Sequence, residues 1–151
     1  MFHPFKYVGC FINHADLHNA ISGVRHNPLE NDIQDPHITF AYMPKKVDRS
    51  LFGRQIGISI VGYGNDGVNE GLLVHLQSDD PKVQAMIEEI EVPHITISVG
   101  DDGKPINTKY LRFESVEPIE MTGKYGGYTK RGKVIVENRR KRRNLISDRR
   151  S

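Results

Sequence analysis

The sequence predicts an α+β fold with two lobes, and three observations carry this prediction. The tetrapeptide Pro-His-Ile-Thr occurs twice, at residues 36–39 and 93–96. Apolar residues at positions i, i+3, i+4 and i+7 precede each copy, a spacing typical of an amphipathic helix. Both halves of the chain also repeat one order of elements: strand, helix, histidine strand, strand. We therefore expect two antiparallel sheets around a central cleft, with flanking helices, formed by pseudo-repeats at about 1–62 and 71–137.

The first pseudo-repeat begins with an apolar run that predicts a strand over residues 5–12. Asn13 is suited to cap the helix that follows. A loop around residues 26–32 separates this helix from the first histidine strand, and residues 56–61 are predicted to form a further strand. The apolar face of the helix is predicted to contain Leu17, Ala20, Ile21 and Val24.

The second pseudo-repeat follows a glycine-rich stretch, residues 62–67, that predicts a hairpin turn. A phosphate-binding loop is not indicated, because no Lys-Ser/Thr pair follows the glycines. Asp80 and Pro81 are typical of the cap and the first residue of a helix. The apolar face of this second helix is predicted to contain Val83, Met86, Ile87 and Ile90. The remaining predicted segments are strands at 71–77, 110–113, 116–121 and 134–136, a turn at 100–103 and a loop at 123–132.

The two Pro-His-Ile-Thr copies hold the residues best suited to chemistry. In an extended strand, side chains alternate between faces, so His37 and Thr39 share one face and Ile38 lies on the other. His94 and Thr96 share a face in the same way. The proline favours this extended geometry because it restricts the residue before it. Each strand is therefore expected to bury its isoleucine and to present its histidine and threonine to the cleft.

Length and composition indicate one domain, which we place at residues 1–137 of the 151. The single cysteine, Cys10, lies in an apolar run and is predicted to be a buried thiol. The sequence has no signal-like start and no apolar stretch of about eighteen residues. We therefore expect a soluble, cytoplasmic protein.

Charge is distributed unevenly along the chain. Residues 1–128 contain 11 Lys/Arg and 17 Asp/Glu, whereas residues 129–151 contain 10 and 2. We interpret residues 138–151 as a basic, flexible tail. Such a tail attracts phosphates with little sequence preference, so we expect at most a weak nucleic-acid contact through it and no membrane contact.

Paired histidines raise the alternative of a zinc site. Catalytic zinc usually takes three protein ligands. The sequence has no His-x-His, Cys-x-x-Cys or His-Glu-x-x-His spacing. His14 and His75 could complete a site only if the fold brought them close. We therefore predict no metal and no other cofactor.

Two histidines that face one another are suited to phosphoryl chemistry without a metal. The ordinary pKa of histidine, about 6.5, lets one imidazole accept a proton while the other, protonated, donates one to a leaving oxygen. A threonine hydroxyl on the same face can bond a non-bridging phosphate oxygen.

With two His-x-Thr motifs on near-duplicated lobes, the chain resembles the 2H phosphoesterase superfamily. Its length, its order of elements and the stretch 92–96 are similar to those of the phage anti-CBASS nucleases, which destroy cyclic oligonucleotide signals. The resemblance implies that His37, Thr39, His94 and Thr96 are catalytic. It also implies metal-independent cleavage of 3′–5′ bonds in cyclic di- or trinucleotides such as cGAMP. A phage protein with this activity would act in the host cytoplasm and let the phage evade CBASS immunity.

The same resemblance implies aromatic side chains that stack on nucleobases. The chain has no tryptophan, so Tyr7, Tyr125 or Tyr128 is expected to take this role. Glu120 is expected to contact a base. Two alternatives stay open at this point: an RNA-end 2′,3′-cyclic phosphodiesterase, and a non-catalytic RNA-binding module of the same fold. The two His-Thr pairs in the same phase favour an enzyme over a pure binding module, and the oligomeric state is left open.

Overall fold

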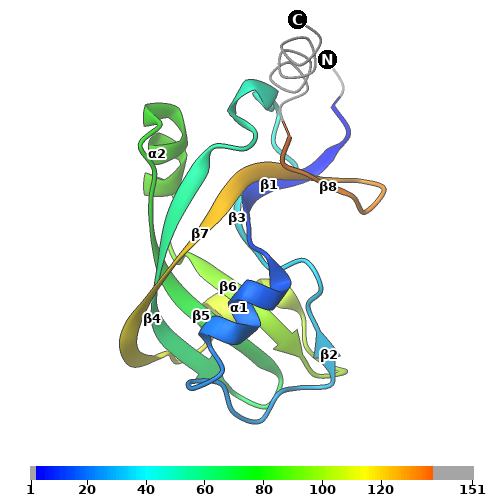
Figure 1. The fold of residues 1–151 in the computed structure, drawn as a ribbon. Helices are drawn as coiled ribbons and strands as arrows, with labels where there is room; N and C mark the ends of the chain where they lie inside the picture. Colours follow the sequence, from blue (N-terminus) through cyan, green and yellow to red (C-terminus); the bar gives the residue numbers. More distant parts are fainter. Residues whose placement is uncertain (1–2, 138–151) are drawn as a thin grey trace, which may run out of the picture.

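The computed structural model describes residues 3–137, which form an α+β body built on one antiparallel sheet (Figure 1). The α+β prediction is therefore confirmed. The helices are α1 (His14–Ala20) and α2 (Pro81–Glu88), and two short 3-10 helices are η1 (Arg49–Leu51) and η2 (Pro105–Tyr110). The strands are β1 (Phe5–Phe11), β2 (Asn31–Asp32), β3 (His37–Tyr42), β4 (Gln55–Asn65), β5 (Asn69–Gln77), β6 (His94–Val99), β7 (Glu114–Thr129) and β8 (Val134–Ile135).

One sheet joins both halves of the chain, whereas the sequence predicted two. The strands follow the order β2-β6-β5-β4-β7-β1-β3, and β8 pairs with β7. The joining strand is β7, whose 16 residues pair first with β4 and then with β1. The order is symmetric about the β4–β7 pair, because β5 and β6 lie beyond β4 while β1 and β3 lie beyond β7.

The two histidine strands, β3 and β6, approach each other although four strands lie between them in the sheet order. In a flat sheet, five spacings of about 4.8 Å would hold them roughly 24 Å apart. Instead, Cα atoms of β3 and β6 come within 8 Å of each other. The sheet is therefore strongly curved, and its curvature brings the two Pro-His-Ile-Thr copies together.

The helix starts that the sequence predicted are confirmed. The side chain of Asn13 accepts a hydrogen bond from the first turn of α1, and that of Asp80 accepts two from the first turn of α2. Pro81 is the first residue of α2. The first helix ends at Ala20, earlier than the apolar spacing predicted, and residues 21–24 form a turn instead.

The predicted loop at 123–132 is mostly strand, because β7 continues to Thr129. Its glycines allow close packing instead of a turn. A Cβ added to Gly126 would lie 2.4 Å from the carbonyl oxygen of Ile135, and one added to Gly127 would lie 2.4 Å from the ring of Phe5. Glycine in a strand often marks such a close approach.

The predicted strand at 110–113 is also wrong. Tyr110 is the last residue of η2, and residues 111–113 belong to no strand. In contrast, the glycine-rich stretch at 62–67 does lead into a hairpin, since β4 and β5 pair with each other. The turn itself is shorter than predicted, because β4 continues to Asn65.

The alternation predicted for the histidine strands is seen in the core. Ile38 of β3 and Ile95 and Ile97 of β6 are at most 1% exposed. Cys10 is also buried, as predicted, and burial raises the pKa of its thiol to about 12. Within residues 3–137, no helix is long and apolar enough to cross a membrane. The basic tail predicted at 138–151 lies outside the described residues.

Candidate active site

The imidazole of His37 is oriented by the backbone just before it. Its Nδ1 atom lies 2.9 Å from the carbonyl oxygen of Asp35, two residues earlier. The intervening Pro36 is buried, and its own carbonyl oxygen accepts a hydrogen bond from the backbone of Ile12, the residue after β1. The proline thus holds the chain in place while the preceding carbonyl reaches the histidine ring.

His94 repeats this arrangement in the second half of the chain. Its Nδ1 atom lies 2.7 Å from the carbonyl oxygen of Val92, and the carbonyl oxygen of Pro93 accepts a hydrogen bond from the backbone of Val74 on β5. The repeated tetrapeptide therefore produces the same local geometry twice, with each histidine tied to the residue two positions before it.

These contacts decide which ring nitrogen carries the hydrogen. A carbonyl oxygen can only accept a hydrogen bond, so Nδ1 of His37 and Nδ1 of His94 must donate. In the neutral imidazole, Nε2 is then the atom with a free lone pair. Each histidine can accept a proton on Nε2, or donate one from it when the ring is charged.

The surroundings favour the neutral form of both rings. Burial lowers the pKa of His37; the charge of His94 lowers it further, and the hydrogen bond to Asp35 opposes these effects. Burial likewise lowers the pKa of His94, the hydrogen bond to Val92 opposes it, and the ammonium of Lys109 adds to the lowering.

Both His-Thr pairs line one cavity with a volume of about 730 Å³. The curved sheet thus brings together all four residues that the sequence analysis placed in catalytic roles, His37, Thr39, His94 and Thr96. A cavity of this size is in the range of small-molecule sites. Its other lining residues are Lys6, Tyr7, Asp32, Ile33, Gln34, Asp35, Tyr42, Lys104, Pro105, Ile106, Lys109 and Tyr128.

Tyr7 lines this cavity, but its ring is already occupied. It stacks on Tyr128 with ring centroids 5.0 Å apart and on His37 with centroids 4.6 Å apart. Because β1 lies between β7 and β3, these two contacts come from opposite sides of Tyr7. The side chain is 9% exposed. Its position therefore suits support of the histidine better than stacking on a nucleobase.

Of the other residues that the resemblance implied for substrate binding, Tyr128 lines the cavity, whereas Tyr125 and Glu120 lie elsewhere. Tyr125 is 2% exposed, packs against Phe52 in the core, and its hydroxyl contacts the sulfur of Met86. Glu120 is exposed and accepts a hydrogen bond from Ser59 across the β4–β7 pair. Neither is among the residues that line the cavity.

Several lining residues were missed by the sequence analysis. Lys104 and Lys109 come from the segment around η2, which lies between the predicted turn at 100–103 and the predicted strand at 110–113 and to which the sequence analysis assigned no element. Tyr42 should face away from His37 by simple alternation. The register between β1 and β3 shifts at Gly9, however, and this shift pairs Tyr42 with Tyr7. A glycine within a predicted strand was the available signal for such a bulge.

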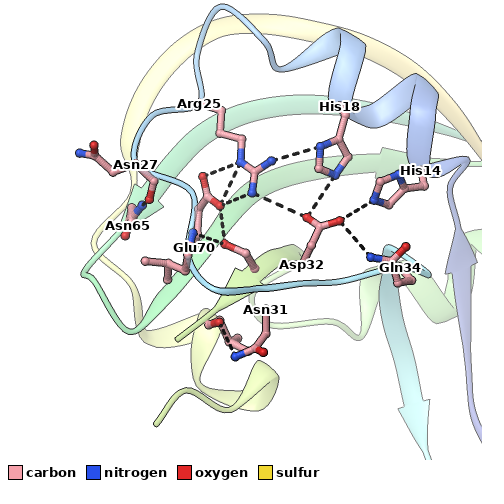
Figure 2. Close-up of polar contacts among 12 residues, drawn as sticks. His14, His18, Arg25, Asn27, Asn31, Asp32, Gln34, Asn65 and Glu70 are labelled. Carbon is pink, nitrogen blue, oxygen red and sulfur yellow. Dashed lines mark hydrogen bonds and ion pairs between the residues drawn. The ribbon is translucent and has the colours of Figure 1, made fainter. Parts of the chain in front are cut away.

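A network of polar and charged side chains holds the wall of the cavity that contains Asp32 (Figure 2). Glu70 is fully buried and accepts hydrogen bonds from Nε and Nη2 of Arg25. His14 lies 2.7 Å from one carboxylate oxygen of Asp32, and His18 lies 3.6 Å from the other. The network connects α1, the following loop and β2 to the sheet, and so positions the segment that leads to His37.

Three residues of this network, His14, His18 and Asp32, could together bind a metal ion, because their ligand atoms lie within 4.8 Å of one another. No other such group is found among the described residues. Nη1 of Arg25, however, lies 3.1 Å from Nδ1 of His18. Arginine can only donate, so Nδ1 accepts and the hydrogen sits on Nε2, the atom facing Asp32. A metal-bound histidine instead donates from its second nitrogen to an acceptor. The geometry therefore favours a hydrogen-bonded network over a metal centre.

A search against protein-family models gives no match, and a search against curated proteins gives none either. The geometry of the cavity is thus the basis for the functional argument.

Proposed function

We propose that this protein is a phosphodiesterase that needs no metal and cleaves 3′–5′ bonds of cyclic di- or trinucleotide signals, which would let a phage evade a host's CBASS immunity. The observation that carries the proposal is the pair of histidines in one cavity, each with Nδ1 committed to a carbonyl and Nε2 left for proton transfer. Paired imidazoles of this kind suit a reaction in which one group accepts a proton while the other donates one.

In the proposed reaction, Nε2 of one neutral histidine takes the proton of the ribose 2′-hydroxyl. The 2′-oxygen attacks phosphorus and forms a new P–O bond, while the P–O5′ bond breaks. The other histidine, protonated, gives its Nε2 hydrogen to the leaving 5′-oxygen. The products are a 2′,3′-cyclic phosphate and a free 5′-hydroxyl, and the proton count balances. Holding the 2′-hydroxyl beside phosphorus replaces a bimolecular step with an intramolecular one.

The rest of the cavity supports a compact, anionic substrate. Lys6, Lys104 and Lys109 line the same cavity and outnumber its two carboxylates, Asp32 and Asp35, a balance that suits phosphates. Tyr42 and Ile106 line the cavity and are 65% and 67% exposed, so they offer apolar surface to a nucleobase. A volume of about 730 Å³ suits a small cyclic nucleotide better than a long RNA.

The test is a panel of cyclic dinucleotides, cyclic trinucleotides, 2′,3′-cyclic mononucleotides and linear RNA, each incubated with purified protein in excess chelator. We expect turnover of at least one cyclic di- or trinucleotide, with a 2′,3′-cyclic phosphate as the first product. Turnover of only the 2′,3′-cyclic ends would assign the protein to the RNA-end phosphodiesterases. Binding of RNA without turnover of any substrate would favour the non-catalytic module.

A matched pair of variants links any activity to this cavity. His94→Gln removes a proposed proton-transfer group, whereas His75→Gln changes an exposed histidine on β5 outside the cavity lining. Activity that is lost in His75→Gln and kept in His94→Gln would contradict the proposed site.

A further inference from the structure

Behind Thr96 lies a buried chain of hydrogen-bonding groups that leads away from the cavity. The hydroxyl oxygen of Thr96 is 2.7 Å from that of Thr108 on η2 and 3.2 Å from the carbonyl oxygen of Pro105. Nδ2 of Asn69, at the start of β5, donates to the Thr108 hydroxyl at 3.0 Å and to the carbonyl oxygen of Lys104 at 2.7 Å. Asn69, Thr96 and Thr108 are at most 8% exposed.

The donor and acceptor roles fix the order of this chain. Asn69 donates to Thr108, so one lone pair of the Thr108 oxygen is used. If Thr96 donated to Thr108, the hydrogen of Thr108 would have no acceptor among the described residues, in a side chain that is 0% exposed. An unsatisfied buried donor is costly. If Thr108 donates to Thr96, the hydrogen of Thr96 can reach Pro105 and every group is satisfied.

The hydrogen bond from Thr96 to Pro105, which ends this series, is the longest of the series. The 3.2 Å contact between Thr96 and Pro105 is long for a hydroxyl donor, which normally lies about 2.7–2.8 Å from its acceptor. A phosphate oxygen that enters the cavity is charged and accepts a hydrogen bond more strongly than a carbonyl does. It can therefore take the Thr96 hydrogen without disturbing the rest of the chain.

The sheet is shaped to hold Thr108 in this place. Gly71 of β5 pairs with Thr96 of β6, and a Cβ added to Gly71 would lie 2.3 Å from the methyl carbon of Thr108. The missing side chain thus leaves room for η2 to pack on β5. On the other half of the cavity, no side-chain hydrogen bond of Thr39 is seen within residues 3–137. The two threonines are therefore not equivalent.

We propose that Asn69 and Thr108 are positioning residues that set Thr96 as a hydrogen-bond donor to the substrate's phosphate; among the described residues, Thr39 has no such partners. This inference rests on the proposed phosphodiesterase function. It predicts that Thr108 acts on turnover only through the Thr96 hydroxyl.

The test is a double-mutant cycle with the active substrate. Thr108→Val keeps the shape of the side chain and removes its hydroxyl; we expect kcat to fall roughly tenfold, the scale of one hydrogen bond to a charged group, with little change in KM. Thr108→Ser restores the hydroxyl and should restore kcat. In the Thr96→Val background, Thr108→Val should have no further effect beyond about threefold. Multiplicative losses in that background would overturn the inference.

A second variant keeps the test decisive if Thr108→Val does not fold. Asn69→Asp replaces the donor by an acceptor, so Thr108 turns its hydrogen toward position 69 and the Thr96 hydrogen is drawn into the chain. We expect the same loss of kcat, again absent in the Thr96→Val background. An Asn69→Asp protein that folds and turns over like wild type would overturn the inference.

Neutron diffraction from a deuterated crystal separates this inference from the proposed function, because it needs no turnover. We expect the deuterium of Thr108 to lie between the two threonine oxygens and that of Thr96 to point toward Pro105. A deuterium of Thr96 that points at Thr108 would overturn the order even in an active enzyme. If the protein shows the expected donor and acceptor order but cleaves no phosphodiester, the hydrogen-bond order is correct and the proposed function is wrong.

Discussion

The imidazole of His37 stacks on the phenol ring of Tyr7, with ring centroids 4.6 Å apart and ring planes 28° apart. The Tyr7 hydroxyl is 3.4 Å from Nδ1 of His37, whereas the carbonyl oxygen of Asp35 is 2.9 Å from the same atom. Asp35 therefore makes the hydrogen bond, and Tyr7 contributes chiefly the flat surface of its ring.

Replacing Tyr7 should separate these two contributions. Tyr7→Phe keeps the ring, so we expect kcat within about threefold of wild type. Tyr7→Leu removes the stacked surface and lets the imidazole move, for which a loss of roughly 10- to 100-fold is expected. Steady-state kinetics on the active substrate check both values. Equal losses in the two variants would show that the hydroxyl, and not the ring, is what matters.

The two histidines should each be required for turnover. His37→Ala and His94→Ala each remove one proton transfer, for which a loss of roughly 10²–10⁴-fold in kcat is expected. Circular dichroism and thermal unfolding check that the variants are folded. A variant that turns over within about threefold of wild type would exclude that histidine from the reaction.

The substrate's 2′-hydroxyl should be indispensable. A cyclic dinucleotide with deoxyribose at the scissile position keeps its phosphates and bases, so we expect it to bind nearly as well as the ribose form. It lacks the nucleophile, and we expect no turnover. Calorimetric binding and product analysis check the two outcomes. Cleavage of the deoxy form at a comparable rate would make water the nucleophile.

Gly9 should be needed to place the first histidine strand. A Cβ at this position would lie 2.0 Å from the carbonyl oxygen of Ile38 and 3.1 Å from Cα of Thr39. Gly9→Ala must push β1 and β3 apart at the bulge, and we expect a loss of about 1–3 kcal/mol in the free energy of unfolding. Gly23→Ala is the matched control, because nothing lies within 4 Å of its added Cβ. Urea unfolding of both variants is the measurement, and equal stability would contradict the argument.

The free energy of unfolding should fall as the solution becomes acidic. The folded-state pKa of His37 and of His94 is lowered, chiefly by burial, so the unfolded chain binds protons more readily than the folded one. The contribution of these two neutral histidines to the free energy of unfolding is fully present above the ordinary histidine pKa of about 6.5. It is lost as the pH falls through and below that value. His37→Gln should therefore lose less stability than wild type between about pH 7.5 and pH 5. Urea unfolding across this range checks it, and parallel curves would contradict it.

The parts of the site that the sequence predicted are those that depend on local geometry. Alternation along a strand is sufficient to place Ile38 in the core and Thr39 on the opposite face, and the caps Asn13 and Asp80 act within one helical turn. That both histidine strands would share a cleft followed from the internal repeat.

The parts that were not predicted depend on contacts between distant segments. Nothing local to Tyr125 indicates that it packs in the core while Tyr128 faces the cavity, because the outcome depends on where β7 crosses β1. Thr108 of η2 comes within hydrogen-bond distance of Thr96 only because Gly71 of β5 leaves room for it. Such relationships involve pairs of residues, and neither member alone carries a signal.

The unbroken sheet also affects the thermodynamics of binding. Strand pairing runs from β6 through β5, β4, β7 and β1 to β3, so the spacing of the two imidazoles is set by a continuous ladder of backbone hydrogen bonds. Within residues 3–137, this pairing links both halves, so no hinge has to close to bring His37 and His94 to the same cavity. A ligand that enters therefore meets both His-Thr pairs already in one cavity, and its binding energy is not reduced by the ordering of two halves. Adaptation to ligands of different size then falls to the segments at the cavity rim, η2 and residues 32–35.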